Sequence, residues 1–205
     1  MPVDTYKGHG FRNDLLQMMV DIKPRFIRFP GISHNDEVET ASSMPFVQEA
    51  LDGIEFARGD ANSTWGSFRA KMGRQEPFEL KYVAIGNEDC GKTYYRGNYI
   101  VFYDAIKKAH PDIKIISNSD GSSHPLDHPA DYYDFHVKIS VWPEPIYTSA
   151  SNLFSMYHQF DRTSRNGPKA FVSEYAVTGK DAGTGSLLAS LGEAAFLIGF
   201  KLRFP

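Results

Sequence analysis

Residues 80–88 read LKYVAIGNE, an apolar and β-branched run that ends in Gly86, Asn87 and Glu88. Such a run predicts a buried β-strand followed by a polar loop. Four other segments follow the same pattern: RFIRFP (25–30), IKIISNSDGSS (113–123), DYYDFHVKI (131–139) and KAFVSEYAVTG (169–179). We therefore expect five strands that are apolar along both faces, as a sheet covered on both sides requires.

Segments with helical spacing of their apolar residues separate these strands. They cover residues 13–23, 43–59, 98–112, about 149–165, and 184–200. In the second segment Ser43 is the expected N-cap and Gly59 the expected stop. Residues 60–79 are expected to form a polar loop. Strands that alternate with helices predict βα units and a parallel sheet, which is the α/β fold class.

Polar side chains stand where the predicted strands end. They are Asn87 and Glu88, Asn118 and Asp120, His136, and Glu174. In βα barrels and in open α/β sheets alike, the C-terminal ends of the strands carry the active site. The position of these residues therefore predicts a functional site on one face of the fold.

Glu88 and Glu174 are a candidate pair of catalytic carboxyl groups. Glycoside hydrolysis uses one carboxyl to protonate the leaving oxygen, while the other attacks the anomeric carbon or activates water. The acid must hold its proton near neutral pH, so its pKa must be raised relative to that of its partner. A single strand-end Glu is more often a helix cap or an ion-pair partner. Two of them, on two strands and in two distinctive motifs, favour the catalytic interpretation.

The composition is that of an ordinary globular protein, with 205 residues, 41% of them hydrophobic and 23% charged. The net charge is −3 and no basic run is present, so nucleic acid is not an expected partner. No run is long and apolar enough to predict a membrane span. The start, MPVDTYKGHGFRNDLL, lacks the pattern of a signal peptide. The 14% of aromatic residues fit a sugar site, and fit a packed core equally well.

Two smaller features have structural interpretations. His124, Asp127 and His128 include the residue types that bind metals, but they lie in a Pro-rich loop, and a solvated loop is the expectation. The chain's one cysteine, Cys90, excludes an internal disulfide. It has no evident His partner in its sequence context, so we expect a small buried residue rather than a nucleophile.

Asn62 begins an N-glycosylation sequon, which matters only in a secreted protein.

Long runs of the chain resemble plant α-L-arabinofuranosidases of glycoside hydrolase family 51. The matching runs are GHGFRNDLLQMMVDIKPRFIRFPG, ISHNDEVETASSMPFVQEALDGIEFARGDANSTWGS, KYVAIGNEDCGKTYYRGNYIVFYDAIKKAHPDIKIISNSDGSSHPLDHPADYYDFH and GPKAFVSEYAVTGKDAG. The resemblance implies a (β/α)8 TIM barrel, of which about five of the eight strands are visible here, and a retaining mechanism without a metal or other cofactor.

The resemblance also implies roles for individual residues. The general acid/base falls on Glu88 of the Gly-Asn-Glu motif, and the nucleophile falls on Glu174 of the Ser-Glu-Tyr motif. Asn87 is expected to hydrogen-bond the sugar 2-hydroxyl. His136 and Tyr147 are expected in the sugar subsite. For Asn87 and His136 the alternative is a satisfied loop residue.

Arg28 is expected to orient carboxylates at the barrel floor, with a structural ion pair as an equal alternative. The implied reaction is removal of terminal α-L-arabinofuranosyl groups from arabinan, arabinoxylan or related cell-wall polymers. The retaining mechanism places the two carboxyl groups about 5–5.5 Å apart. The implied partner is an arabinose-containing glycan, and the implied location is the cell wall.

The chain departs from the family pattern at three places. RFPG runs directly into ISHND, VKISVWPEPI separates His136 from Tyr147, and the chain stops at FLIGFKLRFP. We therefore expect residues 1–205 to be a partial barrel, without the family's N-terminal region and C-terminal β-sandwich. Three alternatives stay open: an inactive fragment or sugar-binding remnant, another retaining barrel glycosidase, and a misassembled gene or alternative transcript.

Overall fold

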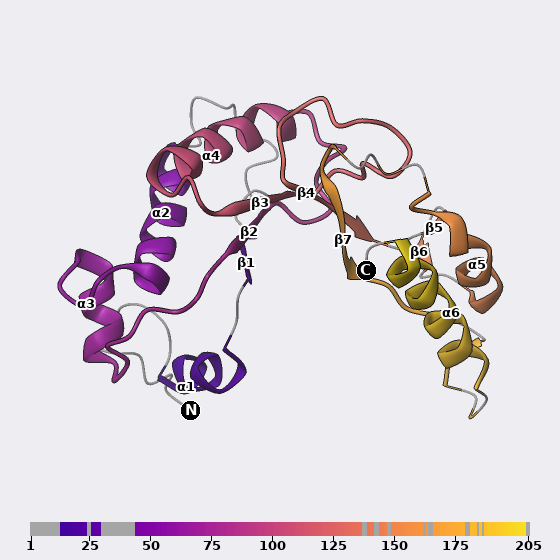
Figure 1. Cartoon of the computed structure of the whole chain (residues 1–205), viewed down its shortest axis with the longest axis horizontal. Helices are drawn as coiled ribbons and strands as arrows, with labels where there is room; N and C mark the ends of the chain where they lie inside the picture. Colours follow the sequence, from indigo (N-terminus) through magenta and orange to yellow (C-terminus); the bar gives the residue numbers. More distant parts are fainter. Residues whose placement is uncertain are drawn as a thin grey trace. The chain divides into compact units, whose positions relative to one another are not determined.

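The computed structural model describes residues 13–23, 26–29, 44–136, 139–141, 144–146, 149–161, 163, 166–178, 181–183, 185 and 187–203. The chain forms two compact units, residues 1–116 and residues 117–205. The five strands expected from sequence are all present, together with a short hairpin that was not expected (Figure 1). No helix within the described ranges is long and apolar enough to cross a bilayer.

The first unit alternates helices and strands. Its elements are α1 (Asn13–Ile22), β1 (Phe26–Phe29), α2 (Met44–Arg58), α3 (Thr64–Lys71), β2 (Tyr82–Ile85), α4 (Tyr95–Ala109) and β3 (Lys114–Ser117). The strand order is β1-β2-β3, and β1 runs parallel to β2. The predicted parallel α/β arrangement is therefore confirmed in this unit. Ser43, the predicted N-cap of α2, lies outside the described residues, while α2 ends at Arg58, directly before Gly59 as predicted.

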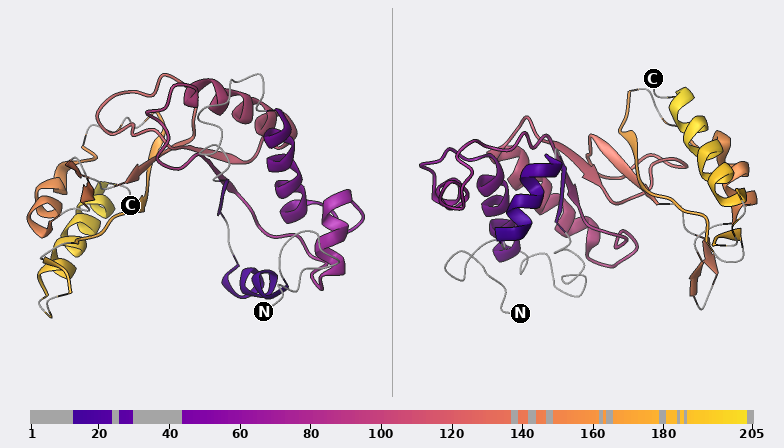
Figure 2. Two further views of the ribbon diagram at one scale, coloured as in Figure 1. Left: turned by 180° about the vertical axis from the view of Figure 1, so that it is seen from behind. Right: turned by 90° about the horizontal axis from the view of Figure 1, so that it is seen from below.

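The core of the first unit lies between the strands and helices α2 and α4, which pack side by side (Figures 1 and 2). The buried face of α4 consists of Tyr95, Tyr99, Phe102 and Ile106. These positions recur every three or four residues, so they form one stripe along the helix. Each large apolar side chain buried in this way contributes about 1.5–3 kcal/mol to folding.

Helix α3 corrects the prediction of a polar loop over residues 60–79. Ser63 begins the helix, because its Oγ accepts a hydrogen bond from the backbone N–H of Gly66 at 3.2 Å. The helix has no continuous apolar stripe, so its sequence pattern was weak. It is held instead by a charged side chain, Arg69, which is fully buried.

The guanidinium of Arg69 ties α3 to the C-terminal end of α2. Its Nη1 donates to the carbonyls of Phe56 at 2.7 Å and Ala57 at 3.3 Å. Its Nη2 donates to the carbonyl of Gly59 at 2.8 Å. Two further contacts complete the set: Nη2 donates to the Gln75 carbonyl at 2.9 Å, and Nε donates to the Arg74 carbonyl at 3.3 Å. The cation therefore satisfies carbonyls at the negative end of a helix dipole, although burial lowers the pKa of Arg69.

The second unit contains a parallel strand pair and a helical layer. Its elements are β4 (Tyr132–His136), β5 (Ile139–Val141), β6 (Glu144–Ile146), α5 (Ala150–Ser155), the 3-10 helix η4 (Met156–His158), β7 (Lys169–Glu174) and α6 (Leu188–Arg203). β4 pairs with β7 in parallel, while β5 and β6 form an antiparallel hairpin. The hairpin occupies the inserted segment after His136. The helix expected over about 149–165 is shorter than predicted, since α5 passes into η4 at Met156.

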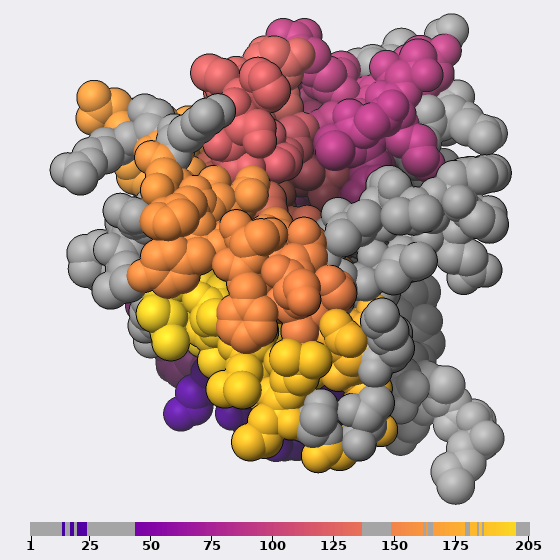
Figure 3. Space-filling model, turned by 90° about the vertical axis from the view of Figure 1, so that its right-hand side faces the viewer, coloured from indigo at the N-terminus to yellow at the C-terminus, as the bar shows by residue number. Residues whose placement is uncertain are grey.

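An aromatic cluster forms the core of the second unit. Phe135 of β4 packs edge-on against Phe160, with ring centroids 5.1 Å apart, and Phe196 of α6 lies next to both. Helices α5 and α6 lie side by side, because Gly192 leaves room for Ala150 (Figure 3). On its other side, α6 exposes large apolar side chains: Leu188, Leu191, Leu197 and Ile198.

Candidate active site

The turn after β2 presents Glu88 in an unusual backbone conformation. Gly86 has φ = 94° and Glu88 has φ = 62°, both in the left-handed region. Glycine adopts this region freely, but a side chain with a Cβ is strained there by about 1–2 kcal/mol. Such strain in a residue other than glycine is concentrated at active sites and ligand-binding turns.

The neighbours of Glu88 hold this turn in place. The backbone N–H of Asn87 donates to Oδ1 of Asp89 at 3.1 Å, and Asp89 is buried. Glu88 itself is exposed. The turn therefore buries the residue after Glu88 and leaves Glu88 accessible, as a group that must meet a substrate requires.

Two other residues that the sequence analysis discussed, Arg28 and Cys90, belong to the first unit. Arg28 lies in β1, and its Cα is paired with that of Ala84 in β2. Cys90 is exposed, so the prediction of a small buried residue is wrong. The physical reason is the turn geometry, in which Asp89 takes the buried position.

In the second unit, a register irregularity lies where β4 and β7 end. Phe135 pairs with Val172, but the next residue, His136, pairs with Glu174, so Ser173 is an extra residue in β7. Bulges of this kind change the direction of side chains and occur next to active sites. Here the extra residue allows two consecutive side chains, Ser173 and Glu174, to approach the same histidine.

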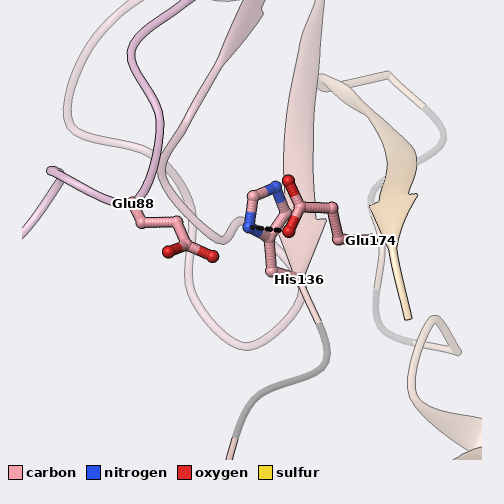
Figure 4. A group of neighbouring side chains, drawn as sticks. All are labelled: Glu88, His136 and Glu174. Atoms are coloured by element: carbon pink, nitrogen blue, oxygen red, sulfur yellow. Dashed lines mark ion pairs between the residues drawn. The ribbon is translucent and has the colours of Figure 1, made fainter. Parts of the chain in front are cut away.

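The His136 ring lies between two carboxylates of the second unit. Its Nε2 is 3.0 Å from Oδ2 of Asp134. Its Nδ1 is 3.8 Å from Oε2 of Glu174, an ion pair drawn in Figure 4. Nε2 is also 3.0 Å from Oγ of Ser173, which donates to Oδ1 of Asp134 at 2.7 Å. Asp134 is buried, whereas the Glu174 side chain is 40% exposed. An exposed carboxylate backed by a buried network can act on a ligand while its neighbours stay fixed.

The structure therefore brings together two of the residues predicted from sequence, His136 and Glu174. Tyr147, the other predicted subsite residue, lies outside the described residues. Asp134 and Ser173 were missed, although both lie within two residues of a predicted site residue. The signal was the strand alternation, which places Asp134 on the same face of β4 as His136.

The loop between β3 and β4 partly corrects another prediction. His124 and Asp127 are exposed, as a solvated loop requires, but His128 is buried. Its Nδ1 lies 2.7 Å from Oδ1 of Asp127, and its Nε2 lies 2.7 Å from Oγ of Ser117. His128 thus anchors the loop to the end of β3. Solvation was expected because the three residues lie in a Pro-rich loop, and the tertiary contact between His128 and Ser117 cannot be read from that local sequence.

Comparison with known proteins gives consistent matches. Residues 19–165 match the family profile described as the alpha-L-arabinofuranosidase 1 domain. Alpha-L-arabinofuranosidase 1 of Arabidopsis thaliana is 68% identical over 265 aligned positions, which cover 98% of this chain and 38% of that protein. Alpha-L-arabinofuranosidase 2 of the same plant is 56% identical with the same coverage. An extracellular exo-alpha-L-arabinofuranosidase of Streptomyces chartreusis is 31% identical over 96% of this chain.

This chain spans 38% of the length of each Arabidopsis relative. The 265 aligned positions exceed the 205 residues of the chain, so the relatives contain internal residues with no counterpart here.

Solved structures agree with the sequence matches. An arabinose-bound GH51 α-L-arabinofuranosidase superposes with a TM-score of 0.65 at 28% identity, over 79% of this chain and 27% of that one. A second arabinofuranosidase structure gives a TM-score of 0.57 at 16% identity, over 93% and 44% of the two chains, and shows the fold alone. The predicted fold class, a TIM-barrel-type α/β fold, is therefore confirmed.

Proposed function

We propose that this chain, which belongs to the family of the alpha-L-arabinofuranosidase 1 domain, carries the catalytic residues of an α-L-arabinofuranosidase. The single observation that carries the proposal is the 68% identity with an Arabidopsis α-L-arabinofuranosidase across 98% of this chain. The strained turn at Glu88 and the ordered surroundings of Glu174 support it, because both are features of a site that holds reactive groups ready. The chain is then part of a (β/α)8 catalytic domain.

The proposed mechanism retains the configuration of the anomeric carbon. Glu174 attacks that carbon while Glu88 gives its proton to the leaving oxygen, which breaks the glycosidic bond and forms a covalent glycosyl–enzyme ester. Glu88, now a carboxylate, removes a proton from water, and the water oxygen displaces Glu174 from the sugar. Asn87, next to Glu88, is proposed to hydrogen-bond the sugar 2-hydroxyl, a contact that strengthens in the transition state.

The finer substrate proposal is a terminal arabinofuranosyl group on a cell-wall arabinan or arabinoxylan, released outside the cell. His136, Tyr147 and Arg28 complete the proposed substrate site. The Streptomyces relative is described as extracellular and exo-acting, which supports both parts of this proposal.

The test is hydrolysis of an aryl α-L-arabinofuranoside by the expressed chain. Glu88→Gln and Glu174→Gln should each lose nearly all turnover, whereas Glu49→Gln on the exposed face of α2 should keep it. Azide should restore turnover to Glu174→Ala, with an azide product of inverted configuration. Glu88→Ala should lose most on substrates with poor leaving groups. Equal activity of Glu174→Gln and Glu49→Gln would refute the assignment.

An inactive sugar-binding fragment is the second candidate, favoured by the internal residues of the relatives that have no counterpart in this chain. It predicts arabinose binding, measured by calorimetry, without turnover of any aryl glycoside. A panel of aryl glycosides in the same assay separates both candidates from another retaining glycosidase, which would prefer a different sugar.

A further inference from the structure

Asp134 and Ser173 form a buried support behind the imidazole of His136. We propose that these two are positioning residues for Glu174, acting through His136: they fix a proton on Nε2 and turn Nδ1 toward the Glu174 carboxylate. The inference rests on the proposed role of Glu174 as nucleophile. Neither Asp134 nor Ser173 is expected to touch the sugar.

The hydrogen bonds decide which ring nitrogen carries a proton. A serine hydroxyl has one hydrogen, and Ser173 gives it to Oδ1 of Asp134 at 2.7 Å. Toward His136, therefore, Oγ of Ser173 can only accept. Oδ2 of Asp134 is also an acceptor, so Nε2 faces two acceptors, each at 3.0 Å. Nε2 must then be the donor to both, as a three-centre hydrogen bond.

Fixing the proton on Nε2 determines what Glu174 meets. Nδ1 is the nitrogen that lies 3.8 Å from Oε2 of Glu174, and it is where the ring takes its second proton. The protonated ring places a cation between the carboxylates of Asp134 and Glu174. This holds the Glu174 carboxylate in one orientation, as attack on an anomeric carbon requires.

Burial makes this support rigid. The side chains of Asp134 and His136 are 1% and 9% exposed, so water competes little for their contacts. The extra residue in β7 is what places Ser173 and Glu174 together beside His136. A regular register would direct these two consecutive side chains to opposite faces of the sheet.

The test combines ring-nitrogen NMR with steady-state kinetics on the full chain. In the parent, two-bond nitrogen–proton correlation spectra should show His136 protonated at Nε2. Asp134→Asn should remove that preference and lower kcat about 10- to 100-fold, the range for loss of a group that orients a functional histidine, while KM changes less than about threefold. Ser173→Ala should lower kcat several-fold, and Ser173→Thr, which keeps the hydroxyl, should recover most of it.

A second His–Asp pair in the same unit supplies the matched control. Nδ1 of His158 lies 3.0 Å from Oδ2 of Asp161, and the His158 side chain is 68% exposed. Asp161→Asn should change only the His158 signals and leave kcat as in the parent. Thermal melting of each variant, followed by circular dichroism, shows whether a loss of kcat comes from unfolding, and Ser173→Ala provides the readout if Asp134→Asn does not fold.

Two results would overturn the inference: a bare Nε2 on His136 in the parent, or a kcat for folded Asp134→Asn within about threefold of the parent. Absence of turnover in the parent would instead overturn the proposed function. The NMR signals of His136 in the parent and in Asp134→Asn would then decide by themselves whether Asp134 fixes the ring.

Discussion

Replacing Arg69 by methionine tests whether a buried charge holds the first unit together. Methionine has a similar length but no donor, so the carbonyls that accept hydrogen bonds from Arg69 would lose this donor. Three of the five hydrogen bonds are 2.7, 2.8 and 2.9 Å long. A hydrogen bond from a charged donor contributes about 1.5–3 kcal/mol.

The three short bonds cannot be summed directly, because burying a guanidinium costs several kcal/mol in desolvation. The net expectation is that Arg69→Met lowers the free energy of unfolding by about 3–5 kcal/mol. Arg69→Lys should recover only a small part of this loss, since an ammonium has three donors and lacks the planar fork. Urea unfolding followed by far-UV circular dichroism measures both variants.

Arg58→Met is the matched control, because Arg58 lies on α2 and pairs with Asp112 at the surface. The two side chains are 26% and 65% exposed, although the pair is bidentate at 2.7 and 3.2 Å. An exposed ion pair of this kind contributes less than about 1 kcal/mol. Equal losses of stability in Arg58→Met and Arg69→Met would refute the reasoning that burial and carbonyl satisfaction make Arg69 important.

Two further outcomes follow from backbone strain and from a buried phenol. The free energy of unfolding of Glu88→Gly, measured in urea, should exceed that of Glu88→Gln by about 0.5–1 kcal/mol. Glycine relieves the left-handed strain at φ = 62°, and its larger loss of chain entropy on folding offsets only part of this gain. A less stable glycine variant would show that the turn is not strained. Burial raises the pKa of Tyr133 to about 12 from 10.0, against the opposing hydrogen bond with Thr163. The folded state thus favours the neutral phenol of Tyr133. The stability that this preference adds to the folded state is fully present below pH 10 and is lost as the pH rises through 12. In the parent, the free energy of unfolding should fall by about 3 kcal/mol as the pH rises from 10 to 12, and Tyr133→Phe should abolish this fall, measured by urea unfolding at several pH values. An equal fall in Tyr133→Phe would show that another group causes it.

Prediction from sequence succeeded where the signal was local. The run ending in Glu88 and the run ending in Glu174 are strands, because short apolar stretches bounded by polar turns have few other stable conformations. Helix α4 was also predicted, since its apolar stripe repeats with the helical period. Glu174 is the last residue of β7 and Glu88 lies in the turn after β2, while the catalytic roles that the family 51 resemblance implies for them stay predictions.

Prediction failed where a distant contact decided the structure. Helix α3 was expected to be a loop, because its sequence has no apolar stripe. The carbonyls that hold its Arg69 belong to α2, to Gly59 and to the segment after α3, so they are not visible in the sequence of α3 itself. His128 was expected in solvent, but Ser117 and Asp127 bury and anchor it. Cys90 was expected to be buried, but the turn after β2 gives that position to Asp89.

The sequence alone therefore determined the five expected strands, the helices between them other than α3, the positions of Glu88 and Glu174 at or just after strand ends, and the family. These depend on periodicity and on motifs, which are properties of neighbouring residues. Only the tertiary structure decided that Asp134 and Ser173 stand behind His136 and that Nδ1 faces Glu174. The reason is the extra residue in β7: it changes the register between two strands more than thirty residues apart, and no pattern within either strand encodes that pairing.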